Sequence, residues 1–328
     1  MTSETLTMKG IKMLALFAAL LLAVPALADD HPARLRYFTQ KPEAVGSTTA
    51  YGANAAAGHF VRSGDARIYY EIYGEGPPLL VLHGGGPGSP YELGTMLDAL
   101  RPHFKVIVVS SRGHGRSEIG HTPVSLAQKA DDVLAVLQAV TNRAVPILGF
   151  SDGAYTACTL AARHPEQVER LVAIGAGTLQ PGHFPPEMKV EDIEKLDKAF
   201  VEQQKRLMPE PGRLQEFWTA YMGFWNKAQV GRETFGTIRC PVLFLAGDED
   251  DHAPVASVLA AHQMTPKSRL CIVPKAGHAA FLDNFPVTWI AVEHFLRAEV
   301  KALGPSKKLP QNDCWQHGQQ DPADAAST

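Results

Sequence analysis

Short apolar runs recur along the middle of the chain, separated by longer amphipathic or polar stretches. The runs are apolar at successive positions instead of alternate ones, which is typical of parallel strands covered by helices on both faces of a sheet. They lie at residues 79–82, 106–109, 145–148, 171–174, 242–246 and 270–273. The pattern therefore predicts six buried strands.

Helical periodicity fills most of the intervals between these runs. It is clearest over residues 125–141, where apolar side chains keep a helical period behind Ser125, a residue suited to cap the first turn. Before the first run, residues 60–63 and 67–73 flank a Gly-Asp turn and predict an antiparallel hairpin. Because strands and helices alternate, we predict an α/β fold with a mostly parallel, doubly wound sheet.

The alternation of strand and helix breaks between residues 178 and 236. Charged and aromatic helical stretches at 191–207 and 214–225 replace the single crossover helix expected there. We therefore predict one domain over residues 60–303, with a small helical cap at about 178–236.

Residues 1–28 have the layout of a cleavable secretory signal. Lys9 and Lys12 precede an apolar run at 13–24, and Ala28 closes an Ala-Leu-Ala sequence suited to cleavage. The run is about a dozen residues long, short of the roughly 20 that a membrane-spanning helix needs. We expect an exported protein, periplasmic or secreted, with no stable membrane anchor. A start at Met8 would leave this signal complete.

The regions on either side of the predicted domain are polar and irregular in sequence. We expect residues 29–59 to be an extension that either lies over the domain or is partly disordered. Residues 304–328 are rich in Gln, Asp, Pro and Ser, and we expect a disordered tail there.

Composition narrows the class of partner. Of 328 residues, 45% are hydrophobic and 20% are charged, and the formal net charge is -3. Because there is no basic excess, we expect a small-molecule substrate and no nucleic acid. The four cysteines are too scattered for a disulfide framework or a metal cluster, although Cys240 and Cys271 could pair.

The sequence pattern with the clearest chemistry surrounds Ser151. Gly149-Phe150-Ser151-Asp152-Gly153 follows the apolar run 145–148 and precedes a helical stretch. Small residues at both ends let the strand and helix pack closely, and the tight turn projects the serine hydroxyl above the sheet. The alternative is a turn serine in a chance Gly-x-Ser-x-Gly, which the flanking strand and helix disfavour.

A serine hydroxyl is a weak nucleophile unless a base takes its proton, so a histidine and an acid should follow. His278 follows the run 270–273, and four consecutive acidic residues at 248–251 follow the run 242–246. Both sets emerge at the carboxyl ends of predicted strands, the edge of an α/β sheet where ligands bind. We expect a histidine and one of these acids to meet Ser151 there.

With these motifs the chain resembles the α/β-hydrolase superfamily. Members often carry Gly-x-x-Asp followed four residues later by Pro, matched here by Gly247, Asp250 and Pro254. The resemblance implies that Asp250 orients His278, with Asp248 as the second choice. It extends over about residues 60–300 and implies the α/β-hydrolase fold, without specifying the substrate.

One turn departs from the family pattern. Residues 111–117 are similar to the family's Asp-x-Arg-Gly-x-Gly-x-Ser turn, but Ser110 replaces the usual leading Asp. The departure concerns the structure of the loop more than its chemistry.

Backbone amides could stabilise an oxyanion at two places. The first is the amide of Asp152, directly behind the nucleophile, and the second lies in His83-Gly84-Gly85-Gly86-Pro87-Gly88, where we choose Gly85 over Gly86. Each such donor contributes about 3–4 kcal/mol in the transition state. A phosphate-binding loop would close with Lys-Ser or Lys-Thr, which this segment lacks. We expect His83 to order the loop.

Three side chains are candidates for substrate binding. The Asp152 carboxylate would attract a cationic group such as the amine of an aminoacyl ester, or else it serves only the helix dipole. Trp218 and Tyr221 belong to an aromatic stripe that either walls an apolar acyl pocket or forms the core of the cap.

These residues predict a serine hydrolase that cleaves a small carboxylic ester or lactone without a metal or organic cofactor. Ser151 would be the nucleophile, His278 its base and Asp250 the orienting acid. An aminopeptidase of the proline-iminopeptidase type is an alternative, because residues 83–88 look like an expanded His-Gly-Gly-Pro-Gly loop. A cofactor-free haloperoxidase or perhydrolase would share the triad.

A non-catalytic binding protein on a hydrolase scaffold is the alternative of another class. It would be expected to lack a member of the triad, and none is missing from the sequence.

Overall fold

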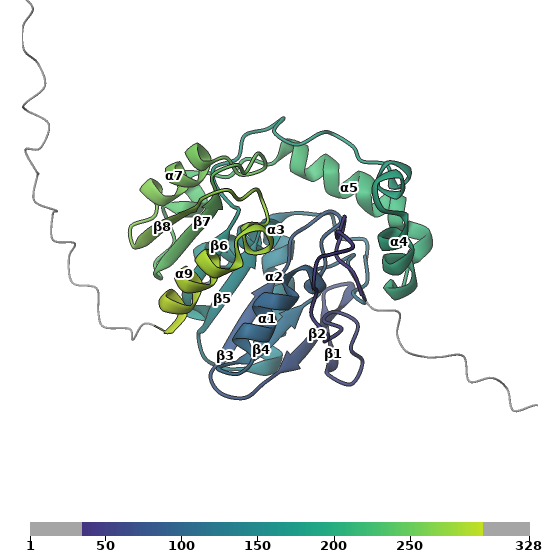
Figure 1. Ribbon diagram of the computed structural model, residues 1–328, viewed down its shortest axis with the longest axis horizontal. Helices are drawn as coiled ribbons and strands as arrows, with labels where there is room; N and C mark the ends of the chain where they lie inside the picture. Colours follow the sequence, from purple (N-terminus) through teal and green to yellow (C-terminus); the bar gives the residue numbers. More distant parts are fainter. Residues whose placement is uncertain (1–34, 298–328) are drawn as a thin grey trace, which may run out of the picture. The chain divides into compact units, whose positions relative to one another are not determined.

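One mixed sheet organises residues 35–297, the part of the chain that the structure describes. The computed structural model places eight strands in the order β1-β2-β4-β3-β5-β6-β7-β8 (Figure 1). The strands are β1 Gly58–Ser63, β2 Ala66–Tyr73, β3 Pro78–Leu82, β4 Lys105–Val109, β5 Val145–Phe150, β6 Val168–Ile174, β7 Val242–Gly247 and β8 Ser268–Val273. From β4 to β8 every neighbouring pair is parallel, whereas β1 and β2 are antiparallel to their neighbours.

Helices cover both faces of this sheet. They are α1 Gly94–Leu100, α2 Leu126–Val140, α3 Asp152–Arg163, α4 Val190–Leu207, α5 Leu214–Lys227, α6 Arg232–Phe235, α7 Val255–Met264, α8 Ala280–Asp283 and α9 Phe285–Arg297. Side chains of α2 and α3 join the apolar core on one face, and side chains of α1 and α9 join the core on the other. The predicted α/β-hydrolase architecture is confirmed.

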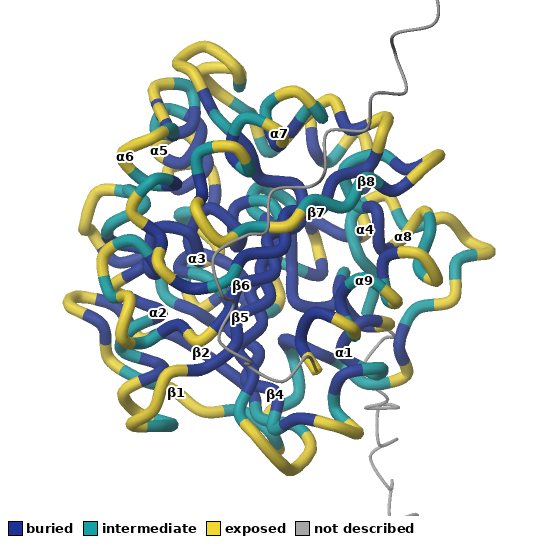
Figure 2. The backbone as a smooth tube through the Cα atoms, turned by 90° about the vertical axis from the view of Figure 1, so that its left-hand side faces the viewer, coloured by how far each residue is buried: buried dark blue, intermediate teal, exposed yellow. Residues whose placement is uncertain are grey.

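The central strands supply both cores at once. In β3, Leu80 and Leu82 face the core of α2 and α3, whereas Leu79 and Val81 face the core of α1 and α9. All four side chains are at most 1% exposed. Successive side chains of a strand point to opposite faces, so a strand covered on both faces must be apolar throughout. This explains the continuous apolar runs, and Figure 2 shows β5 and β6 buried in the middle of the domain.

Local sequence signals set the limits of two predicted elements. The Ser125 side chain accepts a hydrogen bond from the Gln128 amide at 3.1 Å, and α2 begins at the next residue, Leu126. In the hairpin of β1 and β2, Gly64 takes a φ of 55°, a conformation that favours glycine. Both predictions, the helix at 125–141 and the hairpin, are confirmed.

Three helices, α4, α5 and α6, lie between β6 and β7, where the sequence predicted a helical cap. Figure 1 shows α4 and α5 set apart from the sheet as the outer part of this insertion. The buried side of α5 carries Phe217, Trp218, Tyr221 and Trp225, which belong to the same apolar core as α2 and α3. The insertion therefore packs on the domain through its aromatic residues.

The N-terminal strap, residues 36–54, connects α4 to the sheet. At one end, the Thr39 amide donates to Asp197 at 2.8 Å, and the Arg36 guanidinium pairs with the same carboxylate at 2.9 Å. Asp197 has φ -153° and ψ 81°, which interrupts α4, and it caps the second part of the helix by accepting from the Phe200 amide at 3.0 Å.

The other end of the N-terminal strap is fixed to β2. The amides of Gly52 and Asn54 both donate to the buried carboxylate of Glu71 at 2.7 Å. Tyr51 is 1% exposed, and its hydroxyl donates to Asp98 at 2.9 Å. Of the two possibilities left open for residues 29–59, the described part of that segment follows the first, because it lies over the domain.

Some predictions fall on residues outside the described range. The signal at 1–28 and the tail at 304–328 lie there, so they stay predictions. Within the described range, Cys158, Cys240 and Cys271 are free thiols, and the bridge between Cys240 and Cys271 is not formed. Among the helices of residues 35–297, none combines the length and apolarity needed to cross a membrane.

Replacing Asp197 with Ala should lower the free energy of unfolding by about 1–3 kcal/mol, because three donors lose their acceptor. Asp192→Ala on the same helix is the matched control, since Asp192 is exposed and pairs with the exposed Lys195. The control should leave stability close to that of wild type, because exposed ion pairs contribute little. Urea unfolding of both variants measures the difference, and equal values would show that the contacts of Asp197 add nothing to stability.

Candidate active site

Ser151 lies at the turn from β5 into α3, in a strained backbone conformation. Its φ is 50° and its ψ is -117°, outside the regions that a serine ordinarily occupies. Such a residue costs on the order of 1–3 kcal/mol, which the surrounding packing must offset. The turn aims the side chain out of the carboxyl end of β5.

The two glycines that flank this turn are required by close backbone contact. A Cβ atom on Gly149 would lie 2.5 Å from the Gly153 carbonyl oxygen, and one on Gly153 would lie 2.6 Å from the His83 carbonyl oxygen. The Gly153 amide donates to that His83 carbonyl at 3.1 Å. The sequence interpretation of small residues at both ends of the turn matches this geometry.

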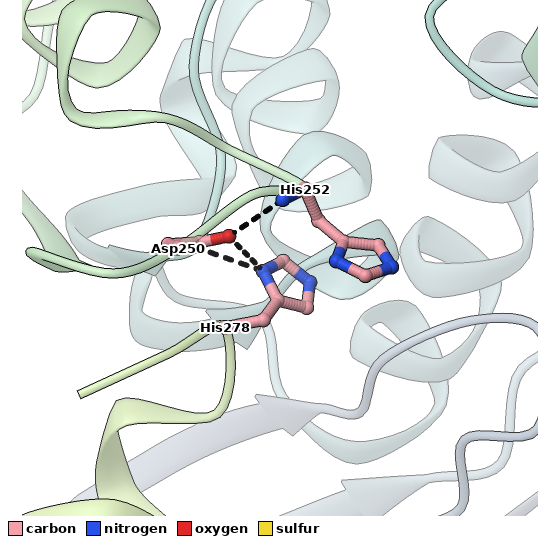
Figure 3. Close-up of side chains that lie close together, drawn as sticks. All are labelled: Asp250, His252 and His278. Atoms are coloured by element: carbon pink, nitrogen blue, oxygen red, sulfur yellow. Dashed lines mark hydrogen bonds and ion pairs between the residues drawn. The ribbon is translucent and has the colours of Figure 1, made fainter.

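The structure brings Ser151, His278 and Asp250 together. The Ser151 Oγ lies 2.8 Å from His278 Nε2, and His278 Nδ1 lies 2.9 Å and 3.0 Å from the two oxygens of Asp250 (Figure 3 shows Asp250 and His278). A carboxylate only accepts, so Nδ1 carries the hydrogen and Nε2 is left with a lone pair facing the serine. This arrangement allows the serine proton to pass to the imidazole.

Of the candidate acids, Asp250 is the one that contacts His278. Its side chain is buried and also accepts from the amides of His252 at 2.9 Å and Ala253 at 2.8 Å. Burial alone would raise the pKa of Asp250, but the hydrogen bonds from His278 and the two amides hold it below its ordinary value. The second choice, Asp248, instead accepts from the Ala276 amide at 3.2 Å.

Two backbone amides are open beside Ser151. Within residues 35–297, neither the Gly85 amide nor the Asp152 amide donates a hydrogen bond to a protein acceptor. A Cβ atom on Gly85 would lie 2.5 Å from Asp152 Oδ2, so the two residues adjoin. The Gly86 amide interacts with the Tyr221 hydroxyl, which favours Gly85 as the donor in this loop.

Side chains hold the loop at residues 83–88 in place. His83 Nε2 accepts from the Ser111 amide at 3.0 Å, and Nδ1 donates to the Gly84 carbonyl at 2.5 Å. Burial lowers the pKa of His83 to about 3, so the ring is neutral. Glu92, which sequence reasoning missed, accepts from the Gly84 amide at 2.7 Å. His83 orders the loop, as predicted.

Comparison with known proteins agrees with this fold. A family described as alpha/beta hydrolase fold matches residues 77–210. Over 258 residues the chain is 26% identical to the pimeloyl-[acyl-carrier protein] methyl ester esterase of Aeromonas hydrophila, an alignment covering 70% of this chain and 99% of the relative. The chain therefore has the α/β-hydrolase fold.

Solved structures of other α/β hydrolases have the same fold. The enol-lactonase from Burkholderia xenovorans LB400 matches 73% of this chain and all of its own, with a TM-score of 0.60 and 20% identity. An N-acyl homoserine lactone degrading enzyme matches 72% of this chain with a TM-score of 0.56 and 25% identity. The relatives are named hydrolases or esterases, and this chain is a hydrolase of that fold.

Asp152 of this α/β hydrolase does not present a free carboxylate. Its Oδ2 accepts from Lys129 Nζ at 2.9 Å and from the Tyr221 hydroxyl at 2.7 Å, and all three side chains are buried. Burial alone would raise the pKa of Asp152, but Lys129 and Tyr221 hold it below its ordinary value. The predicted attraction of a substrate cation is disfavoured, because Lys129 already neutralises the carboxylate.

Trp218 and Tyr221 of the hydrolase occupy different positions on α5. Trp218 and Phe217 line a small cavity of about 20 Å³ with His114 and the backbone of Gly86 and Gly88. Tyr221 lies one turn further along α5 and contacts Asp152. Both aromatic side chains are buried, so they belong to the core of the cap as well as to the surroundings of the site.

Lys129 is a second residue that sequence reasoning missed, although a signal was present. It lies on the same side of α2 as Val133 and Val136, both buried. A lysine on the apolar face of an amphipathic helix must find a carboxylate inside the protein. Nothing in the sequence says that this partner is Asp152.

Breaking the buried pair should destabilise the hydrolase strongly. Lys129→Met leaves the Asp152 charge uncompensated and should cost about 3–5 kcal/mol of unfolding free energy. Lys129→Met combined with Asp152→Asn removes both charges and should recover part of that loss. Denaturant unfolding of the single and double variants tests this, and an equal cost for both would argue against the ion pair.

Glu92 should make stability depend on pH. Burial raises its pKa from 4.5 to about 8, although the amides of Gly84 and Ser89 donate to it. The folded state therefore binds this proton more tightly than the unfolded chain, and its stabilising effect is lost as the pH rises through about 8. Glu92→Gln keeps an acceptor for Gly84 and removes the ionisation.

As the pH rises from 5 to 9, the unfolding free energy of Glu92→Gln should increase relative to that of wild type by on the order of 2–4 kcal/mol. This range follows because one pKa unit corresponds to about 1.4 kcal/mol. Glu75→Gln, at an exposed turn, is the matched control and should follow wild type. Unfolding curves across this pH range provide the measurement. A pH-independent difference between Glu92→Gln and wild type would contradict the shifted pKa.

Proposed function

We propose that this protein hydrolyses a small carboxylic ester or lactone through a covalent acyl-enzyme. The observation that carries the proposal is the continuous chain of contacts from Ser151 Oγ to His278 Nε2 at 2.8 Å and from His278 Nδ1 to Asp250 at 2.9 Å. The open amides of Gly85 and Asp152 lie beside it. Nucleophile, base, orienting acid and oxyanion donors are the four parts that acyl transfer needs.

The first half-reaction forms the acyl-enzyme. Ser151 Oγ attacks the carbonyl carbon while His278 Nε2 takes the hydroxyl proton, and the amides of Gly85 and Asp152 stabilise the negative oxygen. Asp250 stabilises the imidazolium that results. The tetrahedral intermediate then breaks its bond to the alcohol oxygen, and His278 returns the proton to that leaving group.

The second half-reaction releases the acid. Water donates its proton to His278 Nε2 and attacks the acyl carbon, and the same two amides stabilise the second oxyanion. Collapse of this intermediate breaks the bond to Ser151 Oγ, which recovers its proton from His278. Overall, one ester and one water give one acid and one alcohol, and a lactone gives a single hydroxy acid.

The choice of ester or lactone is supported by comparison with similar proteins. The named activities of similar proteins include a methyl ester esterase and an enol-lactonase.

An aminopeptidase is less well supported. An enzyme that selects a free amine needs an unpaired acid close to the nucleophile, and the Asp152 carboxylate is already paired with Lys129 at 2.9 Å. We therefore expect neutral p-nitrophenyl esters to be cleaved faster than their amino-bearing counterparts. The same preference in Asp152→Asn would agree with this, and a strong preference for aminoacyl substrates in wild type would reverse the assignment.

Asp250→Asn should lower kcat by about 10⁴-fold, because an amide cannot stabilise the imidazolium and favours the wrong ring tautomer. Asp248→Asn is the matched control two residues away and should retain activity within a few fold, since Asp248 does not contact His278. Initial rates with p-nitrophenyl acetate measure both. A large loss in Asp248→Asn with little loss in Asp250→Asn would reassign the acid.

Labelling with a fluorophosphonate separates an enzyme from a non-catalytic binding protein. The native chain should be modified at Ser151, as peptide mapping would reveal, and Ser151→Ala should not be labelled. His278→Gln should react at least about 10³-fold more slowly, because the serine loses its base. An unlabelled native chain would favour a binding role.

A further inference from the structure

Three groups that commonly bind metals lie side by side at the edge of the proposed active site. Asp250, His252 and His278 each offer one donor atom, and these three atoms all lie within 4.8 Å of one another. Figure 3 shows Asp250 between the backbone of His252 and the ring of His278, with the two imidazole rings next to each other. The proposed ester hydrolysis uses Asp250 and His278 but assigns no role to the His252 ring.

The His252 ring is held close to His278 by several contacts. The two rings stack with their centroids 4.8 Å apart and their planes at 25°. The His252 amide donates to Asp250 Oδ1 at 2.9 Å, and its carbonyl accepts from His183 Nε2 at 2.8 Å. The backbone is therefore fixed on both sides of the residue, whereas 54% of the side chain is exposed.

A neighbouring carboxylate prepares His252 as a ligand. Its Nδ1 lies 2.7 Å from Asp251 Oδ1, so Nδ1 donates a hydrogen and Nε2 is left with a free lone pair. Metal-binding histidines almost always donate their other ring N–H to a carboxylate, a backbone carbonyl or water, which fixes the tautomer and makes the ligand more basic. Asp251 thus supplies a supporting contact that an incidental surface histidine would lack.

We propose that Asp250, His252 and His278 form a binding site for a divalent transition metal such as Zn²⁺, and that an ion bound there inhibits the enzyme. Two imidazoles and one carboxylate are borderline donors that favour Zn²⁺ or Cu²⁺ over Mg²⁺ or Ca²⁺. Zinc bonds of about 2.0–2.2 Å place the donors of a tetrahedral site roughly 3.3 Å apart. The three donors must therefore close from at most 4.8 Å to about this distance when an ion binds.

Inhibition is expected because two of the metal ligands, Asp250 and His278, also belong to the proposed catalytic triad. This part of the proposal therefore rests on the proposed function. An ion shared with Asp250 binds His278 through Nδ1, the nitrogen 2.9 Å from that carboxylate, and replaces the hydrogen bond between them. The ring hydrogen then sits on Nε2, the nitrogen that faces Ser151. A protonated Nε2 cannot take the proton from Ser151, so the reaction stops. The binding of the ion is independent of this reaction, so the site and the inhibition can be tested separately.

Isothermal titration of the purified full-length chain with ZnCl₂ tests the site directly. His252→Gln removes the third ligand and should raise the Kd for Zn²⁺ by about 10-fold or more, because a chelating donor is lost. The matched control is His103→Gln. His103 is exposed and precedes β4, so it lies at the amino ends of the parallel strands, away from the proposed site. This variant should bind Zn²⁺ like wild type. Ser151→Ala, which removes catalysis, should also keep the affinity.

Hydrolysis of p-nitrophenyl acetate with increasing Zn²⁺ tests the consequence. Wild type and His103→Gln should be inhibited at concentrations close to the measured Kd, EDTA should restore the rate, and Mg²⁺ should have no effect. His252→Gln, measured against its own rate without metal, should need about 10-fold more Zn²⁺.

Each outcome bears on one part of the proposal. Equal Zn²⁺ affinity in wild type and His252→Gln would overturn the site. Binding that depends on His252 but leaves the rate unchanged would overturn the inhibition. A chain that binds Zn²⁺ through His252 and cleaves none of the esters or lactones tested would support the site and count against the proposed function instead.

Discussion

The close approach of α3 to the ends of β3 and β5 is the constraint on which the rest of the site depends. It is possible because Gly149 and Gly153 have no Cβ atoms where the backbones meet. Through that approach the Gly153 amide reaches the His83 carbonyl at 3.1 Å, which ties the nucleophile turn to the glycine-rich loop. The same contact brings the Asp152 and Gly85 residues together and leaves their amides open beside the Ser151 hydroxyl.

Ionisable groups around this turn are controlled mainly by burial. Burial lowers the pKa of His83 to about 3 and the pKa of His114 to about 4, so both rings are neutral. Both rings form hydrogen bonds that support the loops. Asp152 stays ionised under the same burial because Lys129 and Tyr221 contact it. His278, with 21% of its side chain exposed, is the histidine that also contacts a buried acid and a serine.

The sequence was informative wherever a local rule determined the structure. Continuous apolar runs, the Ser125 cap and the Gly-Asp turn each follow from backbone geometry within a few residues, and the strands, α2 and the hairpin are where these signals placed them. The meeting of Ser151 with His278 was predictable because parallel strands end at a common edge. The choice of Asp250 over Asp248 came from resemblance to a family, since spacing alone left both open.

Other features could not be predicted because they join residues far apart in the chain. Lys129 meets Asp152, Glu92 holds Gly84, and Thr39 meets Asp197 on the cap insertion. Each pair consists of common residue types without a motif, and the pairing depends on how loops and helices happen to pack. The ring of His252 beside His278 is another example, since a loop histidine in the sequence gives no sign of its orientation.

The hydrogen bond from the Tyr221 hydroxyl to Asp152 also affects how a ligand can reach Ser151. Any outward swing of α5 would separate the phenol from the carboxylate at 2.7 Å and leave a charged group short of a donor inside the protein. A hydrogen bond to a charged group is worth ~1.5–3 kcal/mol, which would keep the open form about 10 to 150 times rarer than it would otherwise be. A ligand that entered beneath α5 would therefore have to break this hydrogen bond first.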